Sequence, residues 1–372
     1  MFKQTLFVPR ITFGCDPEIF LTKNGAVIGS ERILPEEGIV YDVQDNTTVV
    51  GGEPSGRIII DGVQAELNPR PNTCRANLSK ELRWCFAGLA NKLATEGVEI
   101  NFSNTVEVAK EELDSLSERS RTFGCAPSFN AYNAKAVIGV DPKEYRLRSA
   151  GGHLHLGTGS STKFADLLKQ KDGDKRLVRM FDIIVGNTCV LIDRADGNAE
   201  RRKVYGRAGE YRLPSYGIEY RTLSNFWLQS YQLMSLAFGL ARQAVAICAY
   251  STPENDYESA ILALVNMDDI ERAINTNDFE LAYANFAKIR DTLIAMTPAT
   301  GDEFPIHREI IGAFEHFIKR GSGYFFKQNP LQHWIELPDG HGTGWEAFLR
   351  TTVTEDMKAI RVPQTDGVQS IC

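Results

Sequence analysis

The stretch RRKVYGRAGEYRLPSYGIEYR, residues 201–221, decides how the rest of the chain is interpreted. Its cationic side chains are Arg201, Arg202, Lys203, Arg207, Arg212 and Arg221. It also contains two carboxylates, Glu210 and Glu219. Because side chains alternate between the faces of an extended segment, Glu219 and Arg221 are expected on one face. Such a pair is compatible with two interpretations, a structural ion pair and a metal ligand next to a phosphate-binding arginine.

The size and charge of the chain limit these interpretations. A chain of 372 residues exceeds the usual size of a single core, which predicts one large domain with additions, or two domains. The apolar fraction of 43% and the charged fraction of 24% are typical of a globular protein. A net charge of −7 argues against a general nucleic-acid binder and against an anionic-membrane binder. A local basic pocket within residues 201–221 remains compatible with it.

The chain shows no sign of export or membrane insertion, so a cytoplasmic location is expected. The N-terminal segment MFKQTLFVPRITFG lacks an apolar core followed by a cleavage site. The most apolar run, at 233–250, is interrupted by Arg242 and Gln243, which indicates a buried helix. The seven cysteines are scattered and form no CxxC pair, which predicts reduced thiols.

Strand patterns come first in the chain and helical patterns follow. Extended segments are expected at 11–29, around an Asn24-Gly25 turn, and at 57–69, 98–102, 150–157 and both sides of a turn at 214–217. Helices are expected at 75–96, 106–116, 174–192, 225–250, 255–265, 267–276, 278–296, 305–320 and 345–360. This order predicts an α+β fold with a large antiparallel sheet in the first two-thirds. We divide it into a core at 1–228 and a helical region at 229–372.

Two early strands contain carboxylates among apolar residues. Asp16 and Glu18 share a face of the first strand, and Glu66 lies in VQAELNP. A carboxylate that is buried alone is very costly, so each of these residues needs either solvent or a partner. A solvent-facing hairpin and a ligand-binding site are both compatible with the pattern.

The segment GGHLHLG, residues 151–157, places His153 and His155 on one strand face, with Leu154 and Leu156 on the other. Histidine is the commonest metal ligand and can also donate hydrogen bonds to phosphate. The glycines allow a ligand or another strand to come close. A structural role is the alternative.

Arg207, Arg212 and Arg221 suggest a polyanionic ligand, because the planar guanidinium suits phosphate and carboxylate groups. The alternative is a solvated basic face, or ion pairs with Glu210 and Glu219. No GxxxxGK[ST], GxSxG or HExxH motif occurs, which excludes a P-loop enzyme and gives no support to an α/β-hydrolase or a zincin. The remaining histidines are isolated and are interpreted as surface or packing residues; they are His307, His316, His333 and His341.

Three separate strands thus supply the carboxylates Glu18, Glu66 and Glu219. Hard oxygen ligands suit magnesium or manganese, and arginines suit the phosphates of a nucleotide. Together with the histidine pair, these residues indicate metal–nucleotide chemistry on the face of a sheet.

Four segments, in this order, resemble the carboxylate–amine ligases of the glutamine synthetase-like superfamily. They are GCDPEIF, DGVQAELNPRP, RSAGGHLHLG and YGRAGEYRLPSYGIEYRTLSNFW, over roughly residues 12–227. The most similar group is the phage-type amidoligases, the COOH-NH2 ligase type 2 family. The resemblance implies a glutamine synthetase-like catalytic domain whose large curved antiparallel sheet, flanked by helices, holds ATP and two or three magnesium ions.

The resemblance also implies roles for individual residues. Glu18 and Glu66 correspond to metal ligands of the first strands, with Asp16 as an alternative to Glu18. His153 and His155 correspond to the histidine strand of the superfamily, where a histidine helps to bind metal or phosphate.

The last strand corresponds to the Glu-x-Arg strand of the superfamily. Glu219 would hold metal there, and Arg221 would bind phosphate. Arg207 and Arg212 resemble the arginines that hold the nucleotide phosphates and an acyl phosphate. The other cations of the stretch are expected on a solvated flank, with Arg201 as the reserve candidate for the nucleotide; they are Arg201, Arg202 and Lys203. The implied reaction phosphorylates a substrate carboxylate with ATP, and an amine then displaces phosphate to form an amide.

Two other functions are compatible with the same residues, a guanidino-type kinase and a non-catalytic binding protein. The carboxylate and amine could belong to peptides, cell-wall fragments, polyamines, amino acids or modified nucleobases. An oligomer is compatible with the sequence, and a phage-encoded chain would act in the host cytoplasm.

Overall fold

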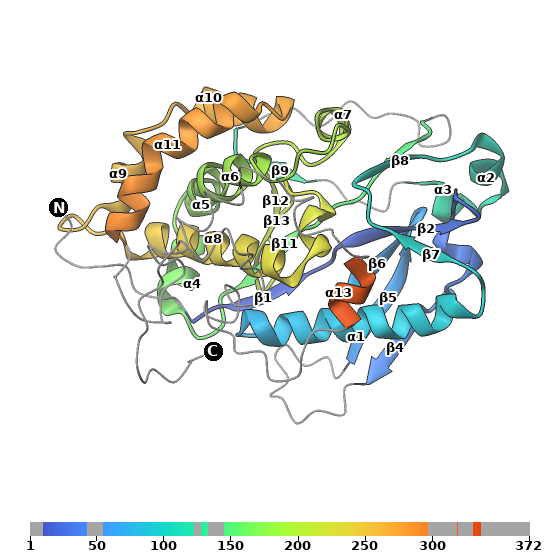
Figure 1. Ribbon diagram of the computed structural model, residues 1–372. Coiled ribbons are helices and arrows are strands. Elements are labelled where there is room, and N and C mark those ends of the chain that lie inside the picture. Colours follow the sequence, from blue (N-terminus) through green and yellow to red (C-terminus); the bar gives the residue numbers. More distant parts are fainter. Residues whose placement is uncertain are drawn as a thin grey trace, which may run out of the picture.

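The computed structural model describes residues 10–42, 55–122, 128–132, 145–296, 318 and 330–335. Within these residues, antiparallel sheets are combined with helices (Figure 1). The α+β prediction is therefore confirmed. The helices expected near 305–320 and 345–360 lie outside the described residues, apart from Ile318.

The first sheet has five strands and contains the histidine and Glu-x-Arg segments. Its strand order is β1 (Thr12–Cys15), β11 (Leu154–Gly157), β13 (Gly217–Tyr220), β12 (Glu210–Arg212) and β9 (Phe129–Asn130). In register, Gly14 pairs with His155, His155 with Glu219, and Glu219 with Arg212. One row across this sheet thus brings three of the predicted site residues together.

The second sheet has six strands and contains the other carboxylates. Its order is β3 (Ala26–Ile28), β2 (Glu18–Lys23), β6 (Gln64–Asn68), β5 (Ser55–Asp61) and β4 (Ile39–Asp42), with β7 (Glu99–Asn101) also paired to β2. Glu18 lies opposite Glu66. A separate pair is formed by β8 (Thr105–Glu107) and β10 (Leu147–Ser149).

The predicted first hairpin is confirmed only at its turn. Asn24 and Gly25 have φ angles of 53° and 79°, as a tight turn between β2 and β3 requires. The expectation of one continuous strand and one large sheet is wrong. Pro17 has no backbone N–H and interrupts the ladder. As a result, β1 pairs with β11, whereas β2 pairs with β6.

The helices surround the two sheets. They are α1 (Arg75–Ala94), α2 (Lys110–Ser115), α3 (Glu118–Arg121), α4 (Thr162–Lys169), α5 (Gly173–Phe181), α6 (Asn187–Val190), α7 (Asn198–Val204), α8 (Tyr231–Tyr250), α9 (Tyr257–Leu262), α10 (Met267–Thr276), α11 (Phe279–Met296) and α13 (Pro330–Ile335). Two short 3-10 turns also occur. The turn η1 (Ser30–Arg32) lies between β3 and β4, and η3 (Asn225–Gln229) lies between β13 and α8. In Figure 1, α1 runs along β4, β5 and β6, and α13 lies against α1.

Three predicted helices differ from expectation. The helix expected at 225–250 is α-helical only from Tyr231, because Asn225–Gln229 form the 3-10 turn η3. The helix expected at 106–116 begins only at Lys110, because Thr105–Glu107 pairs with β10 as a strand. The helix expected at 174–192 changes to a π-helix, η2 (Asp182–Gly186), before α6. A side chain at Gly186 would come within 2.5 Å of the Tyr220 hydroxyl, so the π-segment leaves room for that tyrosine.

The core extends through both halves of the chain. Among the described helices, α8 is long and apolar enough to cross a membrane, but 78% of its most apolar window is buried inside the protein. This confirms the predicted buried helix.

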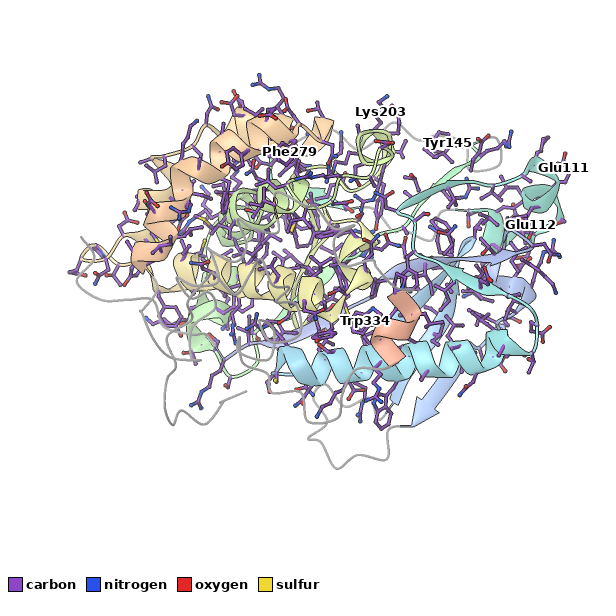
Figure 2. The ribbon with its side chains drawn as sticks, viewed as in Figure 1. Glu111, Glu112, Tyr145, Lys203, Phe279 and Trp334 are labelled. Carbon is purple, nitrogen blue, oxygen red and sulfur yellow. The ribbon has the colours of Figure 1, made fainter. Side chains whose placement is uncertain are left out.

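Trp334 of α13 is buried and its indole N–H donates to the carbonyl of Leu228 (Figure 2). The boundary predicted after residue 228 stays a prediction.

The described cysteines are buried and form no disulfide, as predicted for reduced thiols. These residues are Cys15, Cys74, Cys85, Cys189 and Cys248. Cys125 and Cys372 lie outside the described residues.

A buried ion pair ties α1 to the segment after β6, and breaking it should lower stability. Arg70 donates two hydrogen bonds to Glu81, at 3.0 and 2.7 Å, and both side chains are buried. Glu81→Ala is expected to reduce the free energy of unfolding by about 3–5 kcal/mol, because the Arg70 charge stays buried without this carboxylate. Urea denaturation measures the change. Lys110→Ala, in an exposed pair with Asp114, should change it by less than about 1 kcal/mol, and equal losses would contradict the assignment.

Candidate functional site

Two clusters of potential ligand atoms lie on the two sheets. The histidine cluster consists of Asp16, His153, His155 and Glu219, whose ligand atoms all lie within 4.8 Å of one another. The carboxylate cluster consists of Glu18, Asp61 and Glu66 and meets the same limit. The Asp16-Pro17-Glu18 segment, which crosses from β1 to β2, supplies one carboxylate to each cluster.

Asp16 is the centre of the histidine cluster. Its Oδ1 lies 2.8 Å from Nδ1 of His153 and 3.2 Å from Nε2 of His155. Nδ1 of His153 also lies 3.5 Å from Oε1 of Glu219. Burial alone would raise the pKa of Asp16, but its interactions with the two histidines outweigh burial and hold that pKa well below its usual range. Asp16 is thus an anion whose charge is compensated by its neighbours.

The two histidines differ in environment. Burial lowers the pKa of His153, and Asp16 offsets this only in part. Burial also acts to lower the pKa of His155, but Asp16 and Glu219 outweigh it and raise that pKa. The second ring nitrogen of each histidine contacts a tyrosine: Nε2 of His153 meets the Tyr205 hydroxyl, and Nδ1 of His155 lies 2.7 Å from the Tyr216 hydroxyl. His153 is therefore hydrogen-bonded at both nitrogens, whereas Nε2 of His155 approaches Asp16 without forming a hydrogen bond within the described residues.

The carboxylate cluster has no cationic side chain hydrogen-bonded to it among the described residues. Glu18 accepts hydrogen bonds from the backbone N–H of Gly151 at 2.7 Å and from Gln64 at 3.4 Å, and Glu66 accepts one from Asn68 at 2.7 Å. These donors are neutral, and the charges of Arg201, Arg212 and Arg221 offset the crowding of negative charge only in part.

This crowding appears in the acidities of the cluster. Burial, followed by the nearby Asp61 charge, raises the pKa of Glu18 to about 8. Burial, followed by the Asp16 and Asp61 charges, raises the pKa of Glu66 to about 9. The pKa of Asp61 is raised as well, by burial and by Asp16. A divalent cation would replace these protons and neutralise the repulsion, so the donor set fits magnesium or manganese.

Asp61 was not predicted from the sequence. It ends β5 and faces Gln64 across the tight β5–β6 hairpin, where Ile59 faces Glu66. The signal in the sequence was an acidic residue at the end of the apolar run RIII. Asp61 lies two positions after Ile59, which pairs with Glu66. Only knowledge of the hairpin register places it beside Glu18.

Two of the three predicted arginines lie at Glu219. Nη1 of Arg221 is 3.4 Å and Nη1 of Arg212 is 3.6 Å from Oε1 of Glu219. The prediction that Glu219 and Arg221 share a face is confirmed. Arg207 instead pairs with Glu210, at 3.3 Å, and Glu210 also accepts the backbone N–H of Gly206 at 2.9 Å. Arg207 therefore lies at Glu210, which also supports the loop that contains this arginine.

Oε1 of Glu219 is buried and accepts no hydrogen bond within the described part of the chain. Three nitrogen-bearing groups surround it at 3.4–3.6 Å, beyond good hydrogen-bonding distance. An oxygen of this kind can accept a ligand without losing an existing bond. It is consistent with a cation or a bound substrate at this position.

The prediction that Arg201 and Arg202 form a solvated flank, with Arg201 in reserve for the nucleotide, is wrong. Both are buried in α7. Arg201 donates to the backbone carbonyls of Thr222 and Leu223, at 3.0 and 2.7 Å. Arg202 donates to the carbonyl of Ile274, at 2.6 Å. These arginines satisfy carbonyl groups at the ends of other elements, whereas Lys203 is exposed beside Glu200, as expected (Figure 2).

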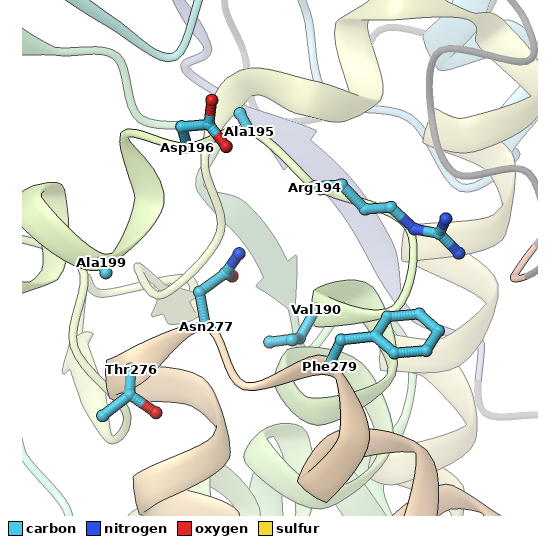
Figure 3. A pocket seen from close by; sticks show the side chains of 8 residues that line it. All are labelled: Val190, Arg194, Ala195, Asp196, Ala199, Thr276, Asn277 and Phe279. Carbon is cyan, nitrogen blue, oxygen red and sulfur yellow. The ribbon is translucent and has the colours of Figure 1, made fainter.

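A cavity of about 400 Å³ lies apart from both clusters. Figure 3 shows its lining: Val190, Arg194, Ala195, Asp196, Ala199, Thr276, Asn277 and Phe279. Arg194 stacks over the Phe279 ring at 4.7 Å, and Asn277 accepts a hydrogen bond from Arg202. Because these polar groups are engaged within the fold, the two clusters are the better candidate for chemistry. Of the isolated histidines, the side chain of His333 and all of His307, His316 and His341 lie outside what the structure describes.

Comparison with protein families shows what the chain is similar to. A family model described as phage phiEco32-like COOH.NH2 ligase type 2 matches residues 135–324, just over half of the chain. The matched region includes His153, His155 and the whole of residues 201–221. It excludes Asp16 and the carboxylate cluster. No curated protein matches the chain.

The raised pKa values of Glu18 and Glu66 predict how the stability of the cation-free protein depends on pH. Between the ordinary glutamate pKa of 4.5 and the folded-state values of about 8 and about 9, the folded protein keeps protons on Glu18 and Glu66 that the unfolded chain releases. The free energy of unfolding should therefore fall as pH rises through this window. Glu66→Gln should flatten the decline, because its amide does not ionise.

Urea unfolding with a chelator present, between about pH 5 and pH 9, measures this slope. Glu99→Gln, at an exposed position of β7, is the matched control and should keep the wild-type slope. Identical slopes in wild type and Glu66→Gln would show that the carboxylate cluster is not under electrostatic strain.

Proposed function

This chain belongs to the phage phiEco32-like COOH.NH2 ligase type 2 family, and on that premise we propose that it joins a carboxylate to an amine at the expense of ATP, with magnesium bound. The family description supports the ligase class. The proposal of ATP and magnesium rests on one observation. Two ligand clusters and two arginines converge where the ends of two sheets meet.

Each cluster would hold a cation with the ligands that it already presents. The carboxylate cluster would use Glu18, Asp61 and Glu66, and the histidine cluster would use Asp16, Glu219 and a nitrogen of His153 or His155. A bound magnesium ion, or manganese, supplies positive charge against the phosphate oxygens of ATP. Asp16 and Glu18 thus need not compete for one role, because the fold gives each its own cluster.

The arginines differ in how they can reach a nucleotide. The side chains of Arg207 and Arg212 are 25% and 29% exposed, so both can contact the phosphates of ATP directly. The side chain of Arg221 is 1% exposed and acts from beneath Glu219. We therefore assign phosphate contact to Arg207 and Arg212, and electrostatic support of the phosphates and of Glu219 to Arg221.

The reaction needs no covalent intermediate on the protein. A substrate carboxylate oxygen attacks the terminal phosphorus of ATP, the bond to ADP breaks, and an acyl phosphate forms. The amine then attacks the acyl carbon, phosphate leaves, and the amine loses a proton as the amide forms. The arginines stabilise the charge that develops on the phosphoryl group.

The substrates are a small molecule or peptide with a carboxylate, and an amine. ATP and the described cysteines, which form no disulfide, favour a cytoplasmic setting, that of the host if the chain is phage-encoded.

Magnesium–ATP binding should depend on the Glu219–Arg221 pair. Glu219→Ala and Arg221→Ala are each expected to weaken the affinity at least tenfold, or about 1.4 kcal/mol. Glu219→Ala removes a ligand of the cation, and Arg221→Ala removes a positive charge that supports the phosphates. Isothermal calorimetry measures the affinity, and Glu219→Gln repeats the test with side-chain volume conserved. Lys203→Ala, an exposed cation of the same stretch, should bind as wild type does. Unchanged affinity in all the Glu219 and Arg221 variants would refute this site.

Product analysis tests the reaction class. A ligase should release ADP and phosphate in equal amounts only when a carboxylate and an amine are both present, because acyl phosphate is consumed by the amine. A screen of paired carboxylates and amines, followed by mass spectrometry for the amide, measures this. A kinase on the same fold would instead give ADP and a stable phosphorylated product with a single acceptor. That outcome would replace the ligase proposal.

A further inference from the structure

Tyr205 lies at the junction of the histidine cluster and the basic stretch. It follows the last residue of α7 in an extended conformation. Its hydroxyl is hydrogen-bonded with Nε2 of His153 and also accepts a bond from Nη2 of Arg221 at 3.3 Å. The His153 and Tyr205 rings meet edge to face, with centroids 5.6 Å apart. One hydroxyl therefore joins the histidine that precedes β11 to the arginine that follows β13.

The Tyr205 ring is itself held by two guanidinium groups. Arg201 lies over it at 5.1 Å and Arg221 at 5.4 Å. Arg201 in turn is fixed by the carbonyls of Thr222 and Leu223. The buried arginine of α7 thus holds the tyrosine in place, which gives Arg201 a role in the site without contact to a ligand.

The Gly-Gly entry to the histidine strand makes this contact possible. A Cβ atom at Gly151 would lie 2.6 Å from Nε2 of His153 and 2.9 Å from the Tyr205 hydroxyl. Real Cβ atoms do not approach so closely. The absence of a side chain at position 151 therefore allows the phenol to reach the imidazole.

The contact determines which ring nitrogen faces the carboxylates. With Nε2 bonded to Tyr205, Nδ1 lies 2.8 Å from Asp16 and 3.5 Å from Glu219. Without the hydroxyl, a buried nitrogen would lose its partner, which is unfavourable. Rotation of the ring would then face a carbon toward Asp16 instead. Outer partners of this kind orient histidines in metal sites.

We propose that Tyr205 is a positioning residue that fixes the orientation of the His153 ring and of Arg221, and thereby sets the cation affinity of the histidine cluster. The part of this inference that concerns cations rests on the proposed function. The part that concerns the ring of His153 does not.

The first measurement reads the ring directly. Long-range 15N–1H NMR of histidine-labelled, cation-free protein reports the tautomer of each imidazole, and His153→Gln identifies the signals of His153. Wild type should show one tautomer, protonated at Nδ1, because Asp16 accepts from that nitrogen and Tyr205 donates to the other. Tyr205→Phe should shift these signals or mix the tautomers.

Tyr211→Phe is the matched control. The Tyr211 hydroxyl is likewise hydrogen-bonded within the fold, because it donates to the Asp174 carboxylate at 2.6 Å. The register of Tyr211 opposite Tyr220 places its side chain on the other face of the sheet. This variant removes the same atom and should leave the His153 signals unchanged. Unchanged His153 signals in Tyr205→Phe would overturn the inference.

The second measurement is the affinity for Mn²⁺ alone, by calorimetry or by electron paramagnetic resonance. Tyr205→Phe should weaken Mn²⁺ binding at the histidine cluster by about 10–100-fold, whereas Tyr211→Phe should bind Mn²⁺ as wild type does. Wild-type affinity in Tyr205→Phe would refute a role in cation binding. If wild type binds no Mn²⁺, the proposed function fails at this cluster, while a shifted His153 tautomer in Tyr205→Phe would still establish the positioning role.

Discussion

The arrangement of both ligand clusters depends on the crowding of negative charge around the Asp16-Pro17-Glu18 segment. Pro17 ends the pairing of β1, and the chain passes into the other sheet within one residue. Two carboxylates that would share one strand face are thereby sent to different clusters. Their charges remain close enough for Asp16 to raise the pKa of Glu18 and of Glu66. The surrounding side chains are arranged around this repulsion.

The two clusters compensate the repulsion in different ways. The histidine cluster contains its own opposing groups, since imidazoles contact Asp16 and guanidiniums flank Glu219. The carboxylate cluster receives only neutral donors and keeps protons instead. Cation binding there would release those protons, so its affinity should rise with pH more steeply than that of the histidine cluster. The same fold thus presents a pre-ionised site beside one that a cation must first deprotonate.

The sequence predicted what depends on local alternation and failed where distant pairing decides. Alternation placed His153 with His155 and Glu219 with Arg221, and Asn24-Gly25 identified a turn. The split at Pro17 was missed because alternation does not say which strand a segment pairs with. Asp61 was missed for the same reason. It becomes a potential ligand only through the hairpin register that sets it beside Glu18 and Glu66.

Burial explains the remaining errors, and it divides residues 201–221 into two functions. A count of charges cannot distinguish Arg201 and Arg202, which satisfy backbone carbonyls, from Arg212, which reaches Glu219 and solvent. Glu210 similarly holds the backbone of Gly206 and the side chain of Arg207. The buried half of the stretch therefore fixes the loop that contains Tyr205 and Arg207. The exposed half can respond to a ligand, because the charges beneath it are already held by the fold.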